Sequence, residues 1–215
     1  MNYRYSWQKA QLWLATNFSR NDLYITLSYD DVLLPHMRKA ADAILSKFLR
    51  QLRATRAASG EVLKYIRCTH ELAGDGGRRL HHHIVINAGE ALRDCELIRS
   101  LWVWGANVEI CRICQCDHYA HDDFLELAQY LARERNPDTG HTTVGTRSWS
   151  GSRNLKRWEY ESELVSDNLT VEAPPGAFIL DSDERRNEYG TFKYIKYLLP
   201  ERSSKGQRAQ KHRLE

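Results

Sequence analysis

The chain has 215 residues, of which 42% are hydrophobic and 27% charged, and its formal net charge is +3. These values are typical of a soluble protein with one domain, or one domain and a modest appendage. No apolar run approaches the roughly 18 residues of a membrane span, and the first residues are too polar for a signal peptide core. The five cysteines are odd in number and partly clustered, which does not fit a secreted disulfide framework. We therefore expect a cytoplasmic protein without membrane contact.

The first part of the chain predicts alternating helices and strands. Residues 5–18 fit a short amphipathic helix, and residues 22–31 alternate apolar and polar side chains as a half-buried strand does. A segment rich in Ala, Leu, Lys and Arg over 35–59 predicts a long helix that ends at Gly60. Residues 61–71 predict a second strand, which a turn-rich connector follows.

The next segments complete a β-α-β-β-α-β pattern. Residues 81–87 predict a third strand, and the short Gly-bearing connector favours an antiparallel hairpin with the second strand. A helix over 89–102, a strand over 106–115 and a helix over 121–135 follow. This order predicts an α+β fold with a ferredoxin-like, split β-α-β antiparallel sheet, in which two helices cover one face. The opposite face of the sheet must either be covered by other parts of the chain or serve a function.

The pattern weakens after Asn136, where turn residues, Trp, Arg and Lys are mixed. We expect a core over 1–136, an extension of the same domain over 137–200, and a basic, disordered tail over 201–215. The chain has no internal repeat and no long low-complexity region.

Three consecutive histidines head the apolar third strand. Successive side chains of a strand point to opposite faces, so His81 and His83 form a pair on one face while His82 points to the other. Two imidazoles at positions i and i+2 can converge on a divalent metal ion. The alternative is a solvated cluster of histidines near a turn, which the apolar run behind them disfavours.

The facing strand offers a third metal ligand. Ile66 and Cys68 are apolar and are expected to face the helices, which places Glu71 on the polar face beside the histidine pair. His70 is the second choice, because it belongs to the other face unless a bulge shifts the alternation.

The helix over 121–135 carries a tyrosine at the edge of its apolar stripe. The stripe follows the i, i+3, i+4, i+7 rule and consists of Phe124, Leu127, Ala128 and Leu131. At the border of this stripe, the ring of Tyr130 can pack while its hydroxyl reaches outward. Arg133 follows three residues later and can stabilise a phenolate or hold a phosphate. A tyrosine that merely seals the edge of the core is the alternative.

Three segments occur in a fixed order: a strand with Thr or Ser ("YITLSYDD"), a histidine segment ("LHHHIVIN") and a helical tyrosine segment ("AQYLARE"). This combination, over about residues 22–135, resembles the HUH (His-hydrophobic-His) endonucleases, most closely the rolling-circle replication initiators of plasmids and phages. The chain departs from the pattern at His82, where a bulky apolar residue is usual, and at Arg133, where lysine is usual. The histidines precede the tyrosine, as in replication initiators and single-tyrosine transposases.

The resemblance implies an enzyme that nicks and joins single-stranded DNA, or a strand extruded at an origin hairpin, to start rolling-circle replication. It implies Mn²⁺ or Mg²⁺ on His81, His83 and Glu71, and a 5′-phosphotyrosine on Tyr130, with Arg133 assisting. Host helicase and polymerase are the implied partners, because the chain has no GxxxxGK[ST] phosphate loop. Basic and aromatic side chains are the expected DNA contacts: Arg78, Arg79, Arg147, Trp149, Arg153, Lys156, Arg157 and Trp158.

Other functions compete with this hypothesis. The segment "CRICQCDHYAH" could bind zinc through Cys111, Cys114, Cys116, His118 and His121. A single-tyrosine transposase would have a similar core. A DNA-binding regulator could keep the fold without the chemistry, since Arg133 replaces the usual lysine.

Overall fold

The computed structural model shows an α+β protein. Its described part contains a five-stranded antiparallel sheet, four α-helices and a separate two-stranded sheet. Contacts divide the chain into two compact units, Met1–Glu159 and Tyr160–Glu215. The structure describes residues 3–72, 78–119, 123–135, 147–159 and 171–199. The basic tail expected over 201–215 lies outside these residues.

The first unit contains every helix and strand that the sequence predicts before residue 136. Its helices are α1 (Tyr3–Asn17), α2 (Arg38–Ala58), α3 (Ala91–Leu101) and α4 (Leu125–Leu131). Its strands are β1 (Leu23–Leu27), β2 (Tyr65–Leu72), β3 (Arg78–Ile86), β4 (Val108–Arg112) and β5 (Trp149–Gly151).

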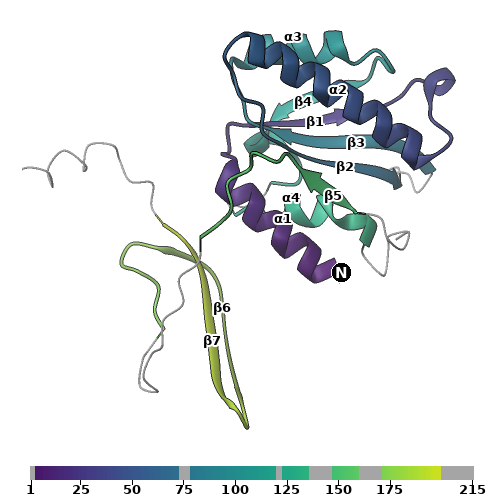
Figure 1. Ribbon diagram of the computed structural model, residues 1–215. Helices are drawn as coiled ribbons and strands as arrows, with labels where there is room; N and C mark the ends of the chain where they lie inside the picture. The colour runs from purple at the N-terminus through teal and green to yellow at the C-terminus, as the bar shows by residue number, and fades with distance from the viewer. Residues whose placement is uncertain (1–2, 73–77, 120–122, 136–146, 160–170, 200–215) are drawn as a thin grey trace, which may run out of the picture. The chain divides into compact units, whose positions relative to one another are not determined.

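The five strands lie in the order β4-β1-β3-β2-β5, and every neighbouring pair is antiparallel. β3 therefore lies between β1 and β2 in the sheet. Along the chain, α2 connects β1 to β2 (Figure 1). β5 adds an edge strand beside β2 that the sequence did not predict, with Cys68 opposite Trp149. This strand has only three residues, too few for alternation to be recognisable.

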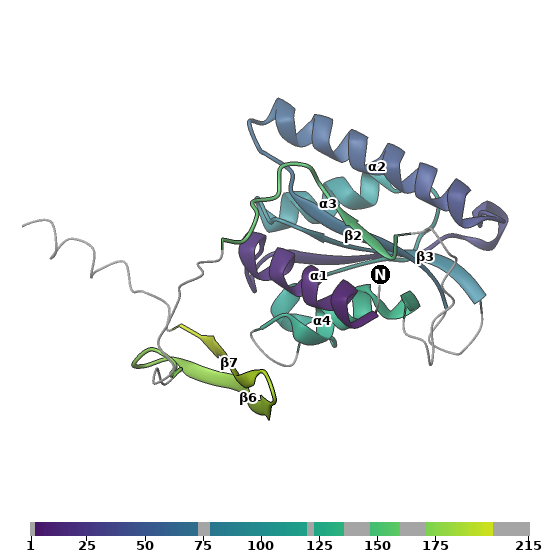
Figure 2. The same ribbon diagram turned by 60° about the horizontal axis from the view of Figure 1, so that its bottom comes forward.

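Helices cover both faces of the sheet, as Figures 1 and 2 show. One apolar cluster joins Ile25 and Ile84 of the sheet to α2 and α3 through residues such as Phe48. The other cluster joins Ile66 and Val85 to α1 and α4. The face left open by the two crossover helices is therefore covered by the apolar sides of α1 and α4.

α4 is shorter than the helix that the sequence predicts over 121–135. Phe124, at its N-cap, has a φ of 59°, a left-handed conformation that does not continue into a helix. After α4 the chain tightens into a 3₁₀ turn over Arg133–Arg135. The carboxylate of Glu134 in this turn accepts a 2.8 Å hydrogen bond from the backbone N–H of Glu71. The backbone conformation of Phe124 thus marks the start of α4, and a tertiary contact of Glu134 follows its end.

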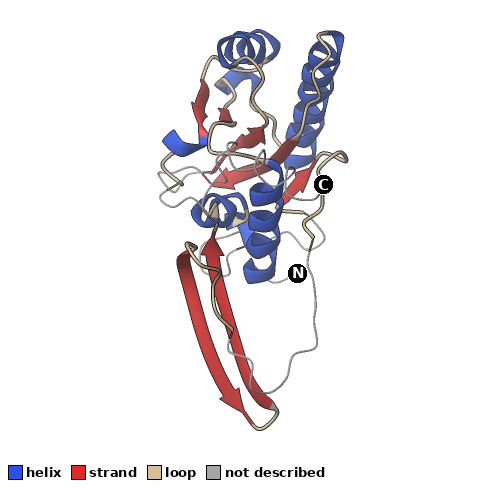
Figure 3. Cartoon of the chain, turned by 90° about the vertical axis from the view of Figure 1, so that its left-hand side faces the viewer, coloured by secondary structure: helices blue, strands red, loops and turns tan. Residues whose placement is uncertain are grey.

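The described residues of the second unit, 171–199, form an antiparallel hairpin of β6 (Phe178–Asn187) and β7 (Gly190–Leu198) (Figure 3). Gly190 begins β7 with a φ of 141°, a backbone conformation that favours glycine. Among the described residues, the structure contains no helix with the length and apolar character needed to cross a membrane.

Candidate metal centre

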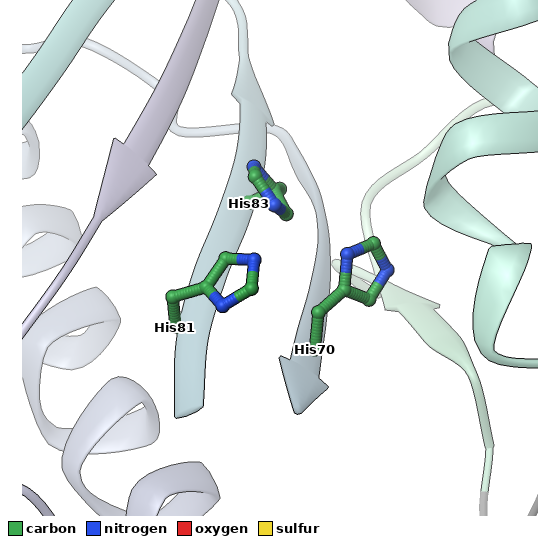
Figure 4. A group of neighbouring side chains, drawn as sticks. All are labelled: His70, His81 and His83. Atoms are coloured by element: carbon green, nitrogen blue, oxygen red, sulfur yellow. The ribbon is translucent and has the colours of Figure 1, made fainter. Parts of the chain in front are cut away.

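Three histidines from adjacent strands meet on the sheet face that α1 and α4 cover. The register of β2 and β3 sets His70 opposite His81 and Cys68 opposite His83, so these side chains share one face. One potential ligand nitrogen from each ring lies within 4.8 Å of the other two. In Figure 4, the rings of His81 and His83 project from β3 and that of His70 from β2, toward a common space. These three side chains are close enough to bind one metal ion.

Hydrogen bonds leave a free lone pair on His70. The Nε2 atom of His70 lies 3.4 Å from the carbonyl oxygen of Leu131, and Nδ1 of His81 lies 2.8 Å from that of Arg79. A carbonyl oxygen only accepts, so these nitrogens carry the protons and the opposite nitrogens carry the lone pairs. On His70 the opposite atom, Nδ1, is buried and has no hydrogen-bond partner. Such an orphaned lone pair fits a metal ligand, since metal-binding histidines donate their other N–H to the protein.

Burial keeps the three imidazoles neutral. Desolvation is the largest cause that lowers the pKa of each histidine, and the positive charge of Arg133 lowers the pKa of all three further. Neutral imidazole is the form that binds metals. The group is therefore in its ligand state at neutral pH.

Glu71 does not belong to this group, whereas His70, the second choice from the sequence, does. Ile66 and Cys68 pack against α1 and α4 instead of α2 and α3, which reverses the faces expected for β2. Glu71 lies 3.6 Å from the guanidinium of Arg38 at the start of α2. The apolar residues of β2 could not mark a unique inner face, because helices cover both faces of the sheet.

Tyr130 lies directly beside the histidines. Its hydroxyl is 3.1 Å from Nε2 of His83, and its ring stacks on that of His118 with centroids 3.7 Å apart. The Arg133 guanidinium lies 4.4 Å from the centre of the Tyr130 ring and 3.2 Å from Nε2 of His81. Burial raises the pKa of Tyr130, and the charge of Arg133 opposes this shift. The structure thus brings the predicted tyrosine, arginine and histidine pair together.

A pocket of about 380 Å³ opens next to Tyr130 and the histidines. Its lining includes polar and aromatic side chains from β1, β3, β4, α4 and the turn that follows β4: Tyr24, Thr26, His81, His83, Glu109, Asp117, His118 and Tyr130. The lining contains two carboxylates, Glu109 and Asp117, and no lysine or arginine, so a phosphate beside the tyrosine hydroxyl would need a cation such as a metal ion on the histidines.

The sequence reasoning missed Tyr24, Thr26 and His118 as members of this site. The Tyr24 hydroxyl lies 2.7 Å from Nδ1 of His83, and Thr26 Oγ1 lies 3.3 Å from the same atom. The alternation of β1 placed Tyr24 and Thr26 on one face, but only the pairing of β1 with β3 set that face beside His83. His118 comes from the turn after β4, where no periodicity locates a side chain.

The predicted DNA contacts are spread over several surfaces of the first unit. Arg79 pairs with Asp31 at 2.6 Å, Arg147 and Trp149 line pockets beside β5, and the ring of Trp158 packs against Trp13. The remaining described members are exposed: Arg153, Lys156 and Arg157. The side chain of Arg78 lies outside the described part of the structure.

The cysteine segment does not form a metal site among the described residues. Cys111, Cys114, Cys116 and His118 do not form a group of three converging ligands, and His121 lies outside the described part. Burial raises the pKa of Cys111 to about 11 and also raises that of Cys116, which keeps both as thiols at neutral pH.

Comparisons with protein-family models, with curated proteins and with solved structures found no match to this chain.

Proposed function

We propose that this chain is a metal-dependent HUH endonuclease that nicks and joins single-stranded DNA through Tyr130, as replication initiators do. The observation that carries the proposal is the 3.1 Å contact between the Tyr130 hydroxyl and His83, a member of the histidine group. The strand order β4-β1-β3-β2, with α2 and α3 on one face, supports a ferredoxin-like core.

His70, His81 and His83 would hold the metal ion, with His70 binding through its orphaned Nδ1. A divalent ion there would polarise a phosphate oxygen and offset the charge of the transition state. Three imidazoles without a carboxylate favour Mn²⁺ over Mg²⁺, because Mg²⁺ prefers oxygen ligands.

Tyr130 acts as the nucleophile. Its phenolate oxygen forms a bond to the phosphorus while the bond from phosphorus to the 3′ oxygen breaks. The departing oxygen takes up a proton and becomes a free 3′-OH, and the 5′ phosphate stays on the tyrosine. Attack by a 3′-OH reverses the step and joins strands. A host polymerase can extend the free 3′-OH, while a host helicase unwinds the duplex.

Arg133 supports the phenolate and the scissile phosphate. Its positive charge over the Tyr130 ring lowers the pKa of Tyr130, whereas burial raises it. The guanidinium keeps the charge of the usual lysine and adds a planar set of donors that suits phosphate oxygens.

The proposal can be tested by incubating the protein and Mn²⁺ with labelled single-stranded DNA from a broad pool of sequences and hairpins. We expect a covalent adduct that survives denaturing electrophoresis and that disappears in Tyr130→Phe. Tyr5→Phe is the control. Tyr5 is 55% exposed on α1, so this variant should still form the adduct. No adduct with any oligonucleotide would contradict the enzyme and favour a DNA-binding regulator, whereas an adduct in Tyr130→Phe would show that another side chain is the nucleophile.

A further inference from the structure

The first of the three sequence segments, "YITLSYDD", has no role in the function proposed above, although it forms most of β1. In the register of β1 and β3, Thr26 lies opposite His83, so these two side chains share a face of the sheet. Tyr24 lies two residues before Thr26 on the same face and is only 6% exposed. β1 therefore brings a buried hydroxyl to the candidate metal centre.

His83 contacts a tyrosine hydroxyl with each of its ring nitrogens. Nδ1 lies 2.7 Å from the hydroxyl of Tyr24, and Nε2 lies 3.1 Å from that of Tyr130. The rings of Tyr24 and His83 are nearly parallel, with an angle of 8° between their planes. A neutral imidazole carries one proton, so only one of the two nitrogens can offer a lone pair to a metal ion.

The strand order indicates that this nitrogen is Nε2. β3 lies between β1 and β2, so Tyr24 and His70 flank His83 from opposite sides. Nδ1 of His83 contacts Tyr24 on the β1 side, which leaves Nε2 as the atom that can share an ion with His70. Nδ1 then carries the proton and donates it to the hydroxyl oxygen of Tyr24.

This assignment gives the three histidines a common pattern. His70 and His81 each donate one N–H to a backbone carbonyl oxygen, and His83 donates to the side chain of Tyr24 instead. Such partners fix the orientation and the tautomer of a metal-binding histidine, and the loss of one costs about 10–100-fold in metal affinity. A substitution cannot remove a backbone carbonyl, so Tyr24 is the partner that mutation can test.

We propose that Tyr24 is a positioning residue of the metal centre: its hydroxyl accepts the Nδ1 proton of His83 and so reserves the Nε2 lone pair for the metal ion. This inference rests on the proposed function, within which it gives the first sequence segment a role. Thr26 is the weaker partner of Nδ1, because its hydroxyl lies 3.3 Å away.

Tyr29→Phe is the matched control for Tyr24→Phe. Tyr29 comes from the same segment and is also buried, and its hydroxyl lies 2.6 Å from Nε2 of His82. His82 points to the other face of β3 and is not a member of the histidine group. Each substitution removes one buried hydroxyl from one histidine, so a merely structural effect would be alike in both variants.

The first measurement is a calorimetric titration of the full chain with Mn²⁺. We expect Tyr24→Phe to weaken Mn²⁺ binding by at least about 10-fold and Tyr29→Phe to keep the wild-type affinity. Equal affinities of the two variants, or no Mn²⁺ binding by the wild type, would overturn the proposal.

The second measurement reads the tautomer of His83 in the wild-type chain, so it does not depend on the folding of Tyr24→Phe. Nitrogen NMR of protein labelled with ¹⁵N-histidine, in EDTA, distinguishes the protonated nitrogen of each ring from the one with the lone pair. The His83 signals are those that His83→Gln lacks. We expect the proton on Nδ1. A proton on Nε2 would make Tyr24 the donor and would reject the proposed role.

The covalent-adduct assay separates this inference from the nuclease. Weaker Mn²⁺ binding in Tyr24→Phe, without an adduct in any variant, keeps the role of Tyr24 and removes the nuclease. Equal adduct formation by wild type and Tyr24→Phe over a series of Mn²⁺ concentrations keeps the nuclease and removes the role of Tyr24.

Discussion

At the scale of single residues, His82 differs from the two histidines beside it. It is fully buried on the face that α2 and α3 cover, with Nε2 2.6 Å from the Tyr29 hydroxyl and Nδ1 2.9 Å from that of Thr69. Burial, helped by nearby positive charge, lowers the pKa of His82 to about 3, so the ring stays neutral. His82 thus fills the position of an apolar residue, because its polar atoms have partners within the core. Strand alternation divides three identical side chains into two candidate ligands and one core residue.

The choice between His70 and Glu71 can be tested by titrating the protein with Mn²⁺ in a calorimeter. His70→Ala should weaken Mn²⁺ binding by at least about 10-fold, since even losing a partner that orients a ligand costs 10–100-fold. Glu71→Gln should leave the affinity nearly unchanged, because Glu71 contacts Arg38 and not the histidines. The reverse ranking would restore Glu71 as the third ligand.

At the scale of elements, a buried ion pair joins α2 to α3. Arg56, near the end of α2, lies 2.7 Å from the carboxylate of Asp94 in the first turn of α3, and both side chains are almost fully buried. Arg56 also donates to the carbonyl of Asn87, and the Asp94 carboxylate accepts from the backbone N–H of Gly89. The ion pair and these hydrogen bonds offset part of the cost of burying two charges, although Nε of Arg56 is buried without a hydrogen-bond partner. They hold the two helices over one face of the sheet.

Asp94→Asn should lower the free energy of unfolding by about 3–5 kcal/mol, because it leaves the Arg56 charge buried without its partner. Urea denaturation measures this change. The control is Glu61→Gln, which breaks the partly exposed pair with Arg93 and should cost less than about 1 kcal/mol. Similar losses of unfolding free energy in both variants would show that the buried ion pair stabilises the protein no more than the partly exposed pair does.

At the scale of the whole molecule, the candidate metal centre depends on long-range contacts. The group draws its candidate ligands from β2 and β3, and the tyrosine comes from α4. The unfolded chain cannot hold this arrangement, so a metal ion that binds it must stabilise the folded state.

Mn²⁺ at about 100 times its dissociation constant should raise the free energy of unfolding by about 2.7 kcal/mol. Thermal denaturation with and without EDTA measures this as a higher midpoint for the transition of the first unit. At the same Mn²⁺ concentration the gain should fall to about 1.4 kcal/mol or less in His70→Ala, whose affinity is at least about 10-fold lower, and persist in Tyr130→Phe, because Tyr130 is not one of the three candidate ligands. Equal stabilisation of wild type and His70→Ala would place the ion elsewhere.

Local periodicity was enough to predict the helices and strands before residue 136, because each element shows its buried side in its own residues. The same reasoning paired His81 with His83 and placed Tyr130 at the edge of its helix. It could not recognise β5, whose three residues are too few to show a period.

The sequence by itself determined which side chains share a face of a strand or helix, since that depends only on backbone geometry. Only the tertiary structure decided what each face meets. α1 and α4 cover the face of β2 that carries Cys68, which places His70 with the histidine pair and turns Glu71 toward Arg38. The contact of Tyr130 with His83 joins residues 47 positions apart, which no local pattern can specify.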